Sequence, residues 1–245
     1  MTIQILNCAS MFPWFRGWHT GAACLLVGTD RGYVLVDTGL GLHDHQSPST
    51  WVRFHRWNFG MHGAPGETAV RQLERMNIPP EQVRDIVLSH LHFDHAGGLP
   101  DFPWAQVHVH RREYEALQHP KTWLERYAYD PKDFQHQPDW VLYDQPTRNW
   151  FGFDAIPLPL LPNIFLIPLI GHTSGHCGVA IHLENNWLFY CGDAAPVNLD
   201  FHATPGWQSR IVLGKHVDRI QAFTRDHPEI QFVAGHMWLS FFDSH

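Results

Sequence analysis

A short run of histidine and aspartate side chains, directly after an apolar segment, constrains this chain more than any other feature. The run is Ile86-Val-Leu-Ser-His-Leu-His-Phe-Asp-His-Ala-Gly-Gly-Leu99. Its apolar start predicts a buried strand. Side chains two positions apart in an extended chain point the same way, so His90 and His92 can reach one metal ion. Asp94 and His95 are adjacent and diverge, which favours a second ion beside the first.

The same succession of an apolar strand, a small residue and then His or Asp recurs along the chain. It recurs at His172, Asp193 and His236. Strands that end together in a sheet bring such residues to one rim. Chance clustering is the competing explanation because the chain has 20 histidines. The repeated context, with Gly97 and Gly98 after the first run, favours a single site instead.

These seven residues supply five imidazoles and two carboxylates, and no thiolate. That donor set suits two borderline divalent cations. We expect zinc, and iron, manganese or cobalt accept the same donors. One ion can take His90, His92 and His172. The other can take Asp94, His95 and His236, with Asp193 as a bridge.

The remaining sequence predicts alternating strands and helices. An Asn185-Asn186 turn and the segment 28–32 predict hairpins. Strands are expected at 3–6, 22–27, 33–36, 83–88, 105–109, 164–170, 178–183, 187–191 and 230–233. Helices are expected at 66–76, 111–118 and 210–225, and an irregular segment at 42–65.

Three further features have alternative interpretations. Asp37, at a strand end before a Gly turn, is either an Asx-turn or a carboxylate that orients a ligand histidine. His108 and His110 alternate with apolar residues and are expected to be strand histidines. The aromatic segments 11–19 and 51–61 are either core-edge packing or the walls of an apolar pocket.

Composition limits the class of protein. An apolar fraction of 44% and the absence of a linker predict one domain spanning 1–245. A net charge of −7 argues against nucleic-acid binding. No segment is long and apolar enough to span a membrane, and no signal peptide is evident, so we expect a soluble cytoplasmic protein. The four cysteines form no C-x-x-C pair and are expected to be reduced thiols. A homodimer is left open.

The order and spacing of the motifs resemble the metallo-β-lactamase superfamily. The run from His90 to His95 is similar to its H-x-H-x-D-H signature. Its other motifs are matched by Asp37-Thr38-Gly39, Gly171-His172-Thr-Ser-Gly-His176, Gly192-Asp193 and Gly235-His236. The resemblance covers about 22–236 and implies an α/β fold, a four-layer αβ/βα sandwich with the metals at one edge. It also implies that His176 supports the site without being a ligand.

Among its members, acyl-homoserine lactonases and glyoxalase II enzymes are most similar in ligand set. The expected activity is therefore that of a dinuclear hydrolase, in which a metal-bridging hydroxide attacks the carbonyl of a small lactone, ester or thioester. Asp94 or Asp193 would carry the proton to the leaving group. The alternatives are a phosphodiesterase at the same site, or a mononuclear iron oxidoreductase similar to the persulfide dioxygenases.

Overall fold

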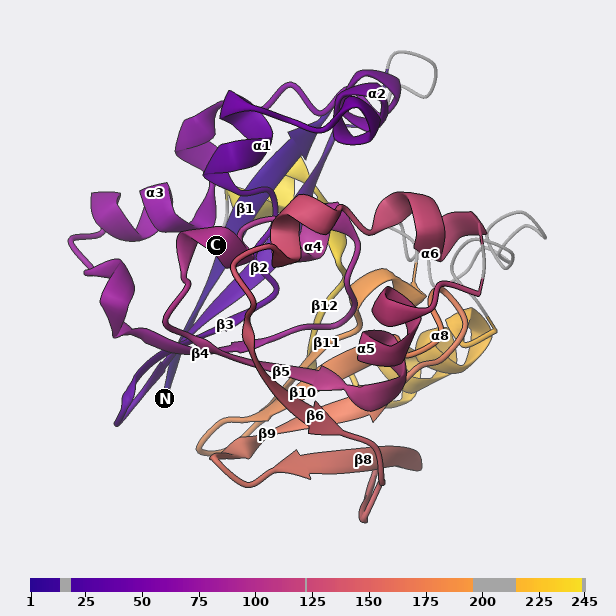
Figure 1. The fold of residues 1–245 in the computed structure, drawn as a ribbon. Helices are drawn as coiled ribbons and strands as arrows, with labels where there is room; N and C mark the ends of the chain where they lie inside the picture. The colour runs from indigo at the N-terminus through magenta and orange to yellow at the C-terminus, as the bar shows by residue number, and fades with distance from the viewer. Residues whose placement is uncertain (14–18, 122, 196–214, 244–245) are drawn as a thin grey trace.

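The computed structural model describes residues 1–13, 19–121, 123–195 and 215–243. Two mixed sheets pack face to face (Figure 1). The strand order is β1-β2-β3-β4-β5-β6 in the first sheet, with β13 beside β2, and β12-β11-β10-β9-β8-β7 in the second.

The strands of the first sheet are β1 (Thr2–Met11), β2 (Thr20–Thr29), β3 (Gly32–Val36), β4 (Val83–Val87), β5 (Gln106–His110), β6 (Asp139–Tyr143) and β13 (His236–Trp238). Those of the second are β7 (Arg148–Trp150), β8 (Phe153–Leu158), β9 (Leu161–Pro168), β10 (Cys177–His182), β11 (Trp187–Tyr190) and β12 (Gln231–Val233). From β3 to β6, each strand runs parallel to the next.

The α-helices are α1 (Leu42–Gln46), α2 (Thr50–Asn58), α3 (Ala69–Arg75), α4 (Phe93–Ala96), α5 (Arg111–Gln118), α6 (Trp123–Ala128), α8 (Val217–Asp226) and α9 (Leu239–Phe242). Short 3-10 turns are η1 (Pro65–Glu67), η2 (Pro80–Gln82), η3 (Leu99–Asp101), η4 (Pro131–Phe134) and η5 (Gly192–Ala194). In the described part of the chain, no helix has the length and apolar character needed to cross a membrane.

The alternation of side chains along the buried strands produces four layers. In β2, Cys24 and Leu26 pack with Leu73 of α3 on one face of the sheet. Leu25 and Val27 point to the other face and pack against the second sheet. A strand with two covered faces is apolar throughout, which is why residues 22–27 lack a polar alternation.

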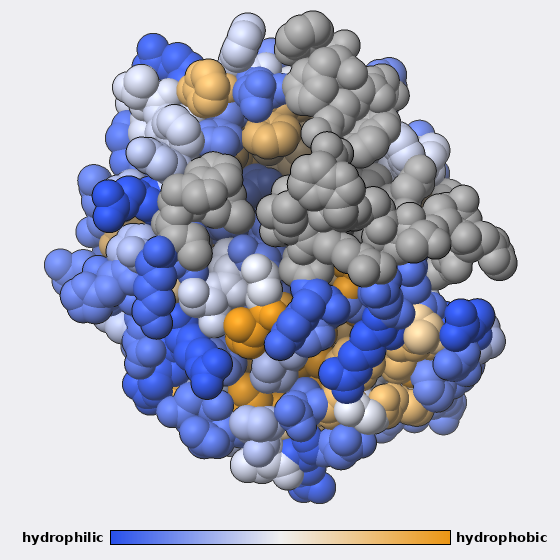
Figure 2. Space-filling view, turned by 90° about the vertical axis from the view of Figure 1, so that its right-hand side faces the viewer, coloured by the Kyte–Doolittle hydropathy of each residue, from blue (hydrophilic) through white to orange (hydrophobic). Residues whose placement is uncertain are grey.

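The outer face of the second sheet is covered by α8. Ile220 and Phe223 of this helix pack against Phe189 of β11 and Phe153 of β8. The order is therefore helices, sheet, sheet and helix, and the predicted four-layer sandwich is confirmed. Where Figure 2 colours the surface, hydrophilic side chains predominate and apolar ones form patches between them.

Strand ends from both sheets meet at one rim and are joined there by main-chain hydrogen bonds. The Cys177 N–H donates to the Ser89 carbonyl at 2.9 Å, which links the start of β10 to the end of β4. The Gly235 N–H donates to the Gly192 carbonyl, and the Ala23 N–H donates to the Gly235 carbonyl, both at 2.8 Å. These bonds hold the loops after β4, β11 and β12 against one another.

Two segments differ from the prediction. The stretch 42–65 is not irregular, because it contains α1 and α2. Ser49 caps α2 by accepting a hydrogen bond from the Val52 N–H at 3.1 Å. Of the helix predicted at 210–225, residues 210–214 lie outside the described residues, and α8 begins only at Val217. All four cysteines are buried and none is in a disulfide, as expected.

Candidate metal centre

The first group of predicted ligands converges at the rim from two loops. His90 and His92 follow β4, and His92 immediately precedes α4. His172 belongs to the loop between β9 and β10. The ring centroid of His90 lies 4.4 Å from that of His92 and 4.9 Å from that of His172. One ligand nitrogen from each ring lies within 4.8 Å of the other two.

The second group is Asp94, His95 and His236, which also offers three ligand atoms within 4.8 Å of one another. Asp94 and His95 lie in α4, and His236 begins β13. The His236 Nε2 atom is 3.5 Å from the Asp94 Oδ2 atom. The two histidine rings are 5.3 Å apart.

Asp193 lies between the two groups. Its Oδ1 atom is 3.3 Å from the Nε2 atom of His95. Its Oδ2 atom is 3.5 Å from the Nε2 atom of His172 and 3.4 Å from that of His236. One carboxylate therefore contacts members of both groups, and the structure brings all seven predicted residues together.

The donor atoms of this cluster fit metal ions. The Nδ1 atom of His90 lies 3.0 Å from the Ser89 hydroxyl, and its buried Nε2 atom has no hydrogen-bond partner. The His92 Nδ1 and His172 Nε2 atoms face each other at 3.1 Å. An unpaired buried polar atom costs about 1–3 kcal/mol. A cation at the centre of the cluster would satisfy these nitrogens.

The pKa values of the candidate ligands are shifted in different directions in the two groups. Burial lowers the pKa values of His90 and His92 well below the ordinary range, so both imidazoles are neutral, the form that binds metals. Burial opposes the charged forms of His95 and His236, but the surrounding carboxylates, Asp193 foremost, together outweigh it and raise both pKa values. Burial would raise the pKa of Asp193, yet His236 and His95 hold it well below its usual range.

Asp37 orients the cluster from the end of β3. Its buried carboxylate accepts hydrogen bonds from the Ser89 N–H at 2.7 Å and the Ser89 hydroxyl at 2.6 Å. It also accepts from His95 Nδ1 at 2.8 Å and from the Tyr190 hydroxyl at 2.6 Å. Of the two interpretations from sequence, the carboxylate that orients a candidate ligand is therefore the one that fits.

His176 and two glycines set the position of Asp193. The His176 Nε2 atom accepts a hydrogen bond from the Asp193 N–H at 3.0 Å, which agrees with a supporting role for this histidine. Gly192 has a φ of +54°, and a Cβ there would lie 2.7 Å from the His176 Nε2 atom. A Cβ on Gly235 would collide with the Asp193 carboxylate. No larger residue fits at either position.

Glu113 supports the centre and was not predicted from the sequence. It is buried in α5, and its carboxylate accepts from the Leu91 N–H at 3.0 Å and from the Gly175 N–H at 2.9 Å. The hydroxyls of Thr173 and Tyr129 also donate to it, each at 2.7 Å. It therefore ties the loop of His90 to the loop of His172. Its spacing in an amphipathic helix gave no signal of this role.

The two strand histidines of β5 lie apart from the cluster. His108 Nε2 is paired with the Asp85 carboxylate at 2.9 Å, and its Nδ1 atom is 2.9 Å from the Tyr143 hydroxyl. The His110 Nδ1 atom accepts from the Arg112 N–H at the start of α5. Both agree with the predicted structural role.

The aromatic segment at 51–61 forms most of α2, which lies beside α4. The His55 ring is 5.6 Å from the ring of Phe93. Phe93 lies in sequence between the candidate ligands His92 and Asp94. Trp51 stacks on Phe54 at 5.5 Å, and Phe54 and Trp57 are 49% and 62% exposed. Of the segment at 11–19, residues 14–18 lie outside the described residues.

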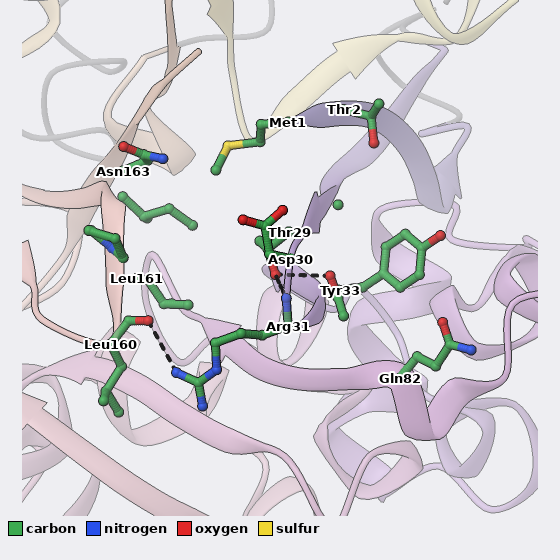
Figure 3. Close-up of a pocket in the computed structure, with 14 residues that line it drawn as sticks. Met1, Thr2, Thr29, Asp30, Arg31, Tyr33, Gln82, Leu160, Leu161 and Asn163 are labelled. Atoms are coloured by element: carbon green, nitrogen blue, oxygen red, sulfur yellow. Dashed lines mark hydrogen bonds between the residues drawn. The ribbon is translucent and has the colours of Figure 1, made fainter. Parts of the chain in front are cut away.

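A cavity of about 640 Å³ lies at the opposite end of the sandwich (Figure 3). The β2–β3 hairpin and the turn between β8 and β9 line it, and Arg31 Nη1 donates to the Leu160 carbonyl across it at 3.5 Å. Gly32 starts β3 at this cavity, whereas Asp37 follows the end of β3 at the cluster. Five residues of strand, about 16 Å, therefore separate the two sites.

Comparison with known proteins gives one family. The family model described as the metallo-beta-lactamase superfamily matches residues 18–236. A probable metallo-hydrolase of Mycobacterium tuberculosis is 38% identical over 196 residues, which are 78% of this chain and 62% of that protein. An N-acyl homoserine lactonase of a Bacillus species is 29% identical over 175 residues, 66% of this chain and 59% of that protein. The match thus spans less than two thirds of either relative.

Solved structures share the fold. A mutant of Bacillus thuringiensis AiiA, with N-decanoyl-L-homoserine bound at its active site, superposes with a TM-score of 0.70. The two are 20% identical, over 99% of this chain and 95% of that one. A probable metal-dependent hydrolase from Staphylococcus aureus also gives 0.70, at 17% identity over 96% of this chain and 89% of that one.

Proposed function

Since this chain belongs to the metallo-β-lactamase superfamily, we propose that it is a hydrolase that depends on two divalent cations. Zinc is the proposed ion, and the same donors accept iron, manganese or cobalt. His90, His92 and His172 would hold one ion. Asp94, His95 and His236 would hold the other, and Asp193 would contact both.

The position of Asp193 carries this proposal. Its two carboxylate oxygens face imidazoles of both groups at 3.3–3.5 Å. A single ion bound by His90, His92 and His172 would leave the second group of three donors, which contacts the same carboxylate, without an ion. Two groups of three donors with one shared carboxylate supply enough ligands for two ions.

Two divalent cations in this cluster would supply a water with a lowered pKa and an electrophile for a substrate carbonyl. The protein side chains supply position and proton transfer. Asp94 is suited to move the proton to the leaving oxygen because its side chain is 13% exposed and contacts one imidazole. Asp193 contacts three imidazoles, which favours a fixed role for its carboxylate.

For the substrate we propose a small lactone, ester or thioester with an apolar group. The relatives named N-acyl homoserine lactonase support a lactone. The aromatic side chains of α2 support an apolar group: His55 contacts Phe93, which lies between His92 and Asp94 in sequence, and Phe54 and Trp57 are exposed on the same helix. The chain has 17 Lys and Arg against 24 Asp and Glu, which argues against a polyanionic substrate such as a nucleic acid.

A hydrolysis screen on protein with a measured metal content tests the proposal. Lactones, carboxylic esters, thioesters and phosphodiesters are compared at equal concentration. We expect two metal ions per chain and turnover of carbonyl substrates. One iron per chain with oxygen consumption, or turnover of phosphodiesters alone, would overturn it.

The variant Asp193→Ala tests the shared carboxylate. We expect nearly all turnover to be lost while the circular dichroism spectrum of the fold is unchanged. A near-normal rate with two ions still bound contradicts the role given to Asp193.

A further inference from the structure

A second cluster of ligand-type side chains lies outside the candidate metal centre. It consists of His43 and Asp44 in α1 and Asp133 in η4. The Nε2 atom of His43 is 3.3 Å from the Asp44 Oδ1 atom and 2.9 Å from the Asp133 Oδ1 atom. These residues offer three ligand atoms within 4.8 Å of one another.

The two carboxylates of this cluster are fully buried, and each has an oxygen with no hydrogen-bond partner. Asp44 and Asp133 both have an exposed fraction of 0%. The unpaired atoms are Asp44 Oδ1, which faces the His43 ring, and Asp133 Oδ2. A third carboxylate, Asp130, is 4% exposed and also has one unpaired oxygen. Buried unpaired carboxylate oxygens are costly and indicate a missing partner.

The neighbouring cationic side chains do not supply that partner. The Arg56 guanidinium donates to the main-chain carbonyl of Asp44, not to its carboxylate. Lys132 donates its ammonium to the Ser47 carbonyl at 2.7 Å. One imidazole thus faces two carboxyl groups directly, and the carboxyl group of Asp130 is close enough to act on Asp44 electrostatically.

We propose that His43, Asp44 and Asp133 bind a further divalent cation of the first transition row, separate from the candidate metal centre. Tetrahedral zinc with bonds of about 2.0–2.1 Å places its ligands about 3.3 Å apart, close to the separation of His43 and Asp44. An imidazole donor disfavours calcium and magnesium, which take oxygen ligands. Asp130 is the nearest source of a fourth ligand.

This cation would fasten two segments that are distant in the chain. His43 and Asp133 are 90 positions apart. Asp44 also accepts a hydrogen bond from the Gly41 N–H at 2.9 Å, which fixes the turn between Asp37 and α1. The bound ion would thus hold η4 against the segment that follows the Asp37 carboxylate, and its role would be structural.

The test counts metal ions in three proteins. Wild type, Asp133→Asn and the control Asp101→Asn are dialysed to equilibrium against micromolar zinc, and zinc per chain is measured by plasma mass spectrometry. Asp101 accepts from the Leu42 N–H of α1 at 3.0 Å but is not in the cluster, and asparagine keeps an acceptor there. We expect Asp133→Asn to hold one ion fewer than both other proteins.

An equal count in all three proteins overturns the proposal. If Asp133→Asn does not fold, His43→Gln gives the same comparison, with one ion fewer expected and the wild-type count overturning it. The test depends only on the difference in zinc per chain between the variants. Its result is therefore independent of the proposed function, whether the main centre holds one ion or two.

Discussion

Replacing Asp37 by asparagine tests whether this carboxylate orients the metal centre, because the substitution leaves every candidate ligand in place. The Asp37 carboxylate accepts four hydrogen bonds, from the N–H and hydroxyl of Ser89, from His95 and from Tyr190. Because it accepts from the His95 Nδ1–H group, it favours the neutral tautomer whose Nε2 atom, which faces Asp193 at 3.3 Å, is free to bind a metal ion. Asparagine has a single acceptor oxygen, and its amide can donate to Nδ1 instead.

The expected magnitude follows from these contacts. An amide that donates to His95 Nδ1 moves the imidazole proton to Nε2, where it competes with a metal ion. Loss of such an orienting partner typically costs 10–100-fold in metal affinity, or about 1.4–2.7 kcal/mol. The unmatched donors around residue 37 should also lower the free energy of unfolding by about 1–3 kcal/mol.

Asp85→Asn is a matched control, because Asp85 forms a buried pair with His108 at 2.9 Å away from the metal centre. Zinc affinity is measured by competition with a chromophoric chelator, and stability by urea unfolding. We expect both variants to lose stability and only Asp37→Asn to lose zinc affinity. Unchanged affinity in Asp37→Asn, or an equal loss in Asp85→Asn, would refute the orienting role.

Three other predictions follow from the same contacts. Gly235→Ala should reduce turnover at least tenfold, because the new methyl group displaces the Asp193 carboxylate, and metal content measured beside the rate will show whether an ion is lost as well. Glu113→Ala should lower the melting temperature by several degrees and weaken zinc binding. Glu113→Gln should lie between it and wild type, because its one amide oxygen can still accept two of the four hydrogen bonds. In metal-free protein, burial and the nearby Asp133 charge raise the pKa of Asp44 from 3.8 to about 8. Its stabilising contribution is therefore complete below pH 3.8 and is lost as the pH rises through 8, so Asp44→Asn should flatten the decline in unfolding free energy between those values.

The candidate ligands could be predicted from sequence because each one follows a recognisable strand. The apolar runs before His90 and His172 are long enough to identify, and the Gly-Asp and Gly-His pairs mark the ends of β11 and β12. Strand ends in adjacent positions must meet at one rim, so seven residues from four segments could be assigned to one site without knowledge of the tertiary contacts.

Segments without an inward apolar stripe were not predictable. In α2 only Val52 is buried, while Phe54 and Trp57 point outward, so the helical period of buried residues is missing from the sequence. Strands β7 and β8 were missed because β7 is the edge strand of the second sheet, β8 is its neighbour, and both carry polar residues such as Arg148 and Asp154.

The buried carboxylates of Asp37 and Glu113 support the metal centre in a way that the ligand motif does not indicate. Asp37 holds the histidine loop through Ser89 and His95, and Glu113 holds it through the Leu91 N–H between the first two histidines. These carboxylates come from the residue after β3 and from α5, on either side of the loop in sequence, and no local pattern connects them to it. A loop with three histidines in six positions would otherwise have many conformations. Two buried carboxylates that accept its main-chain N–H groups reduce that number before any ion binds, so the rigidity of the centre depends on residues that the ligand spacing does not reveal.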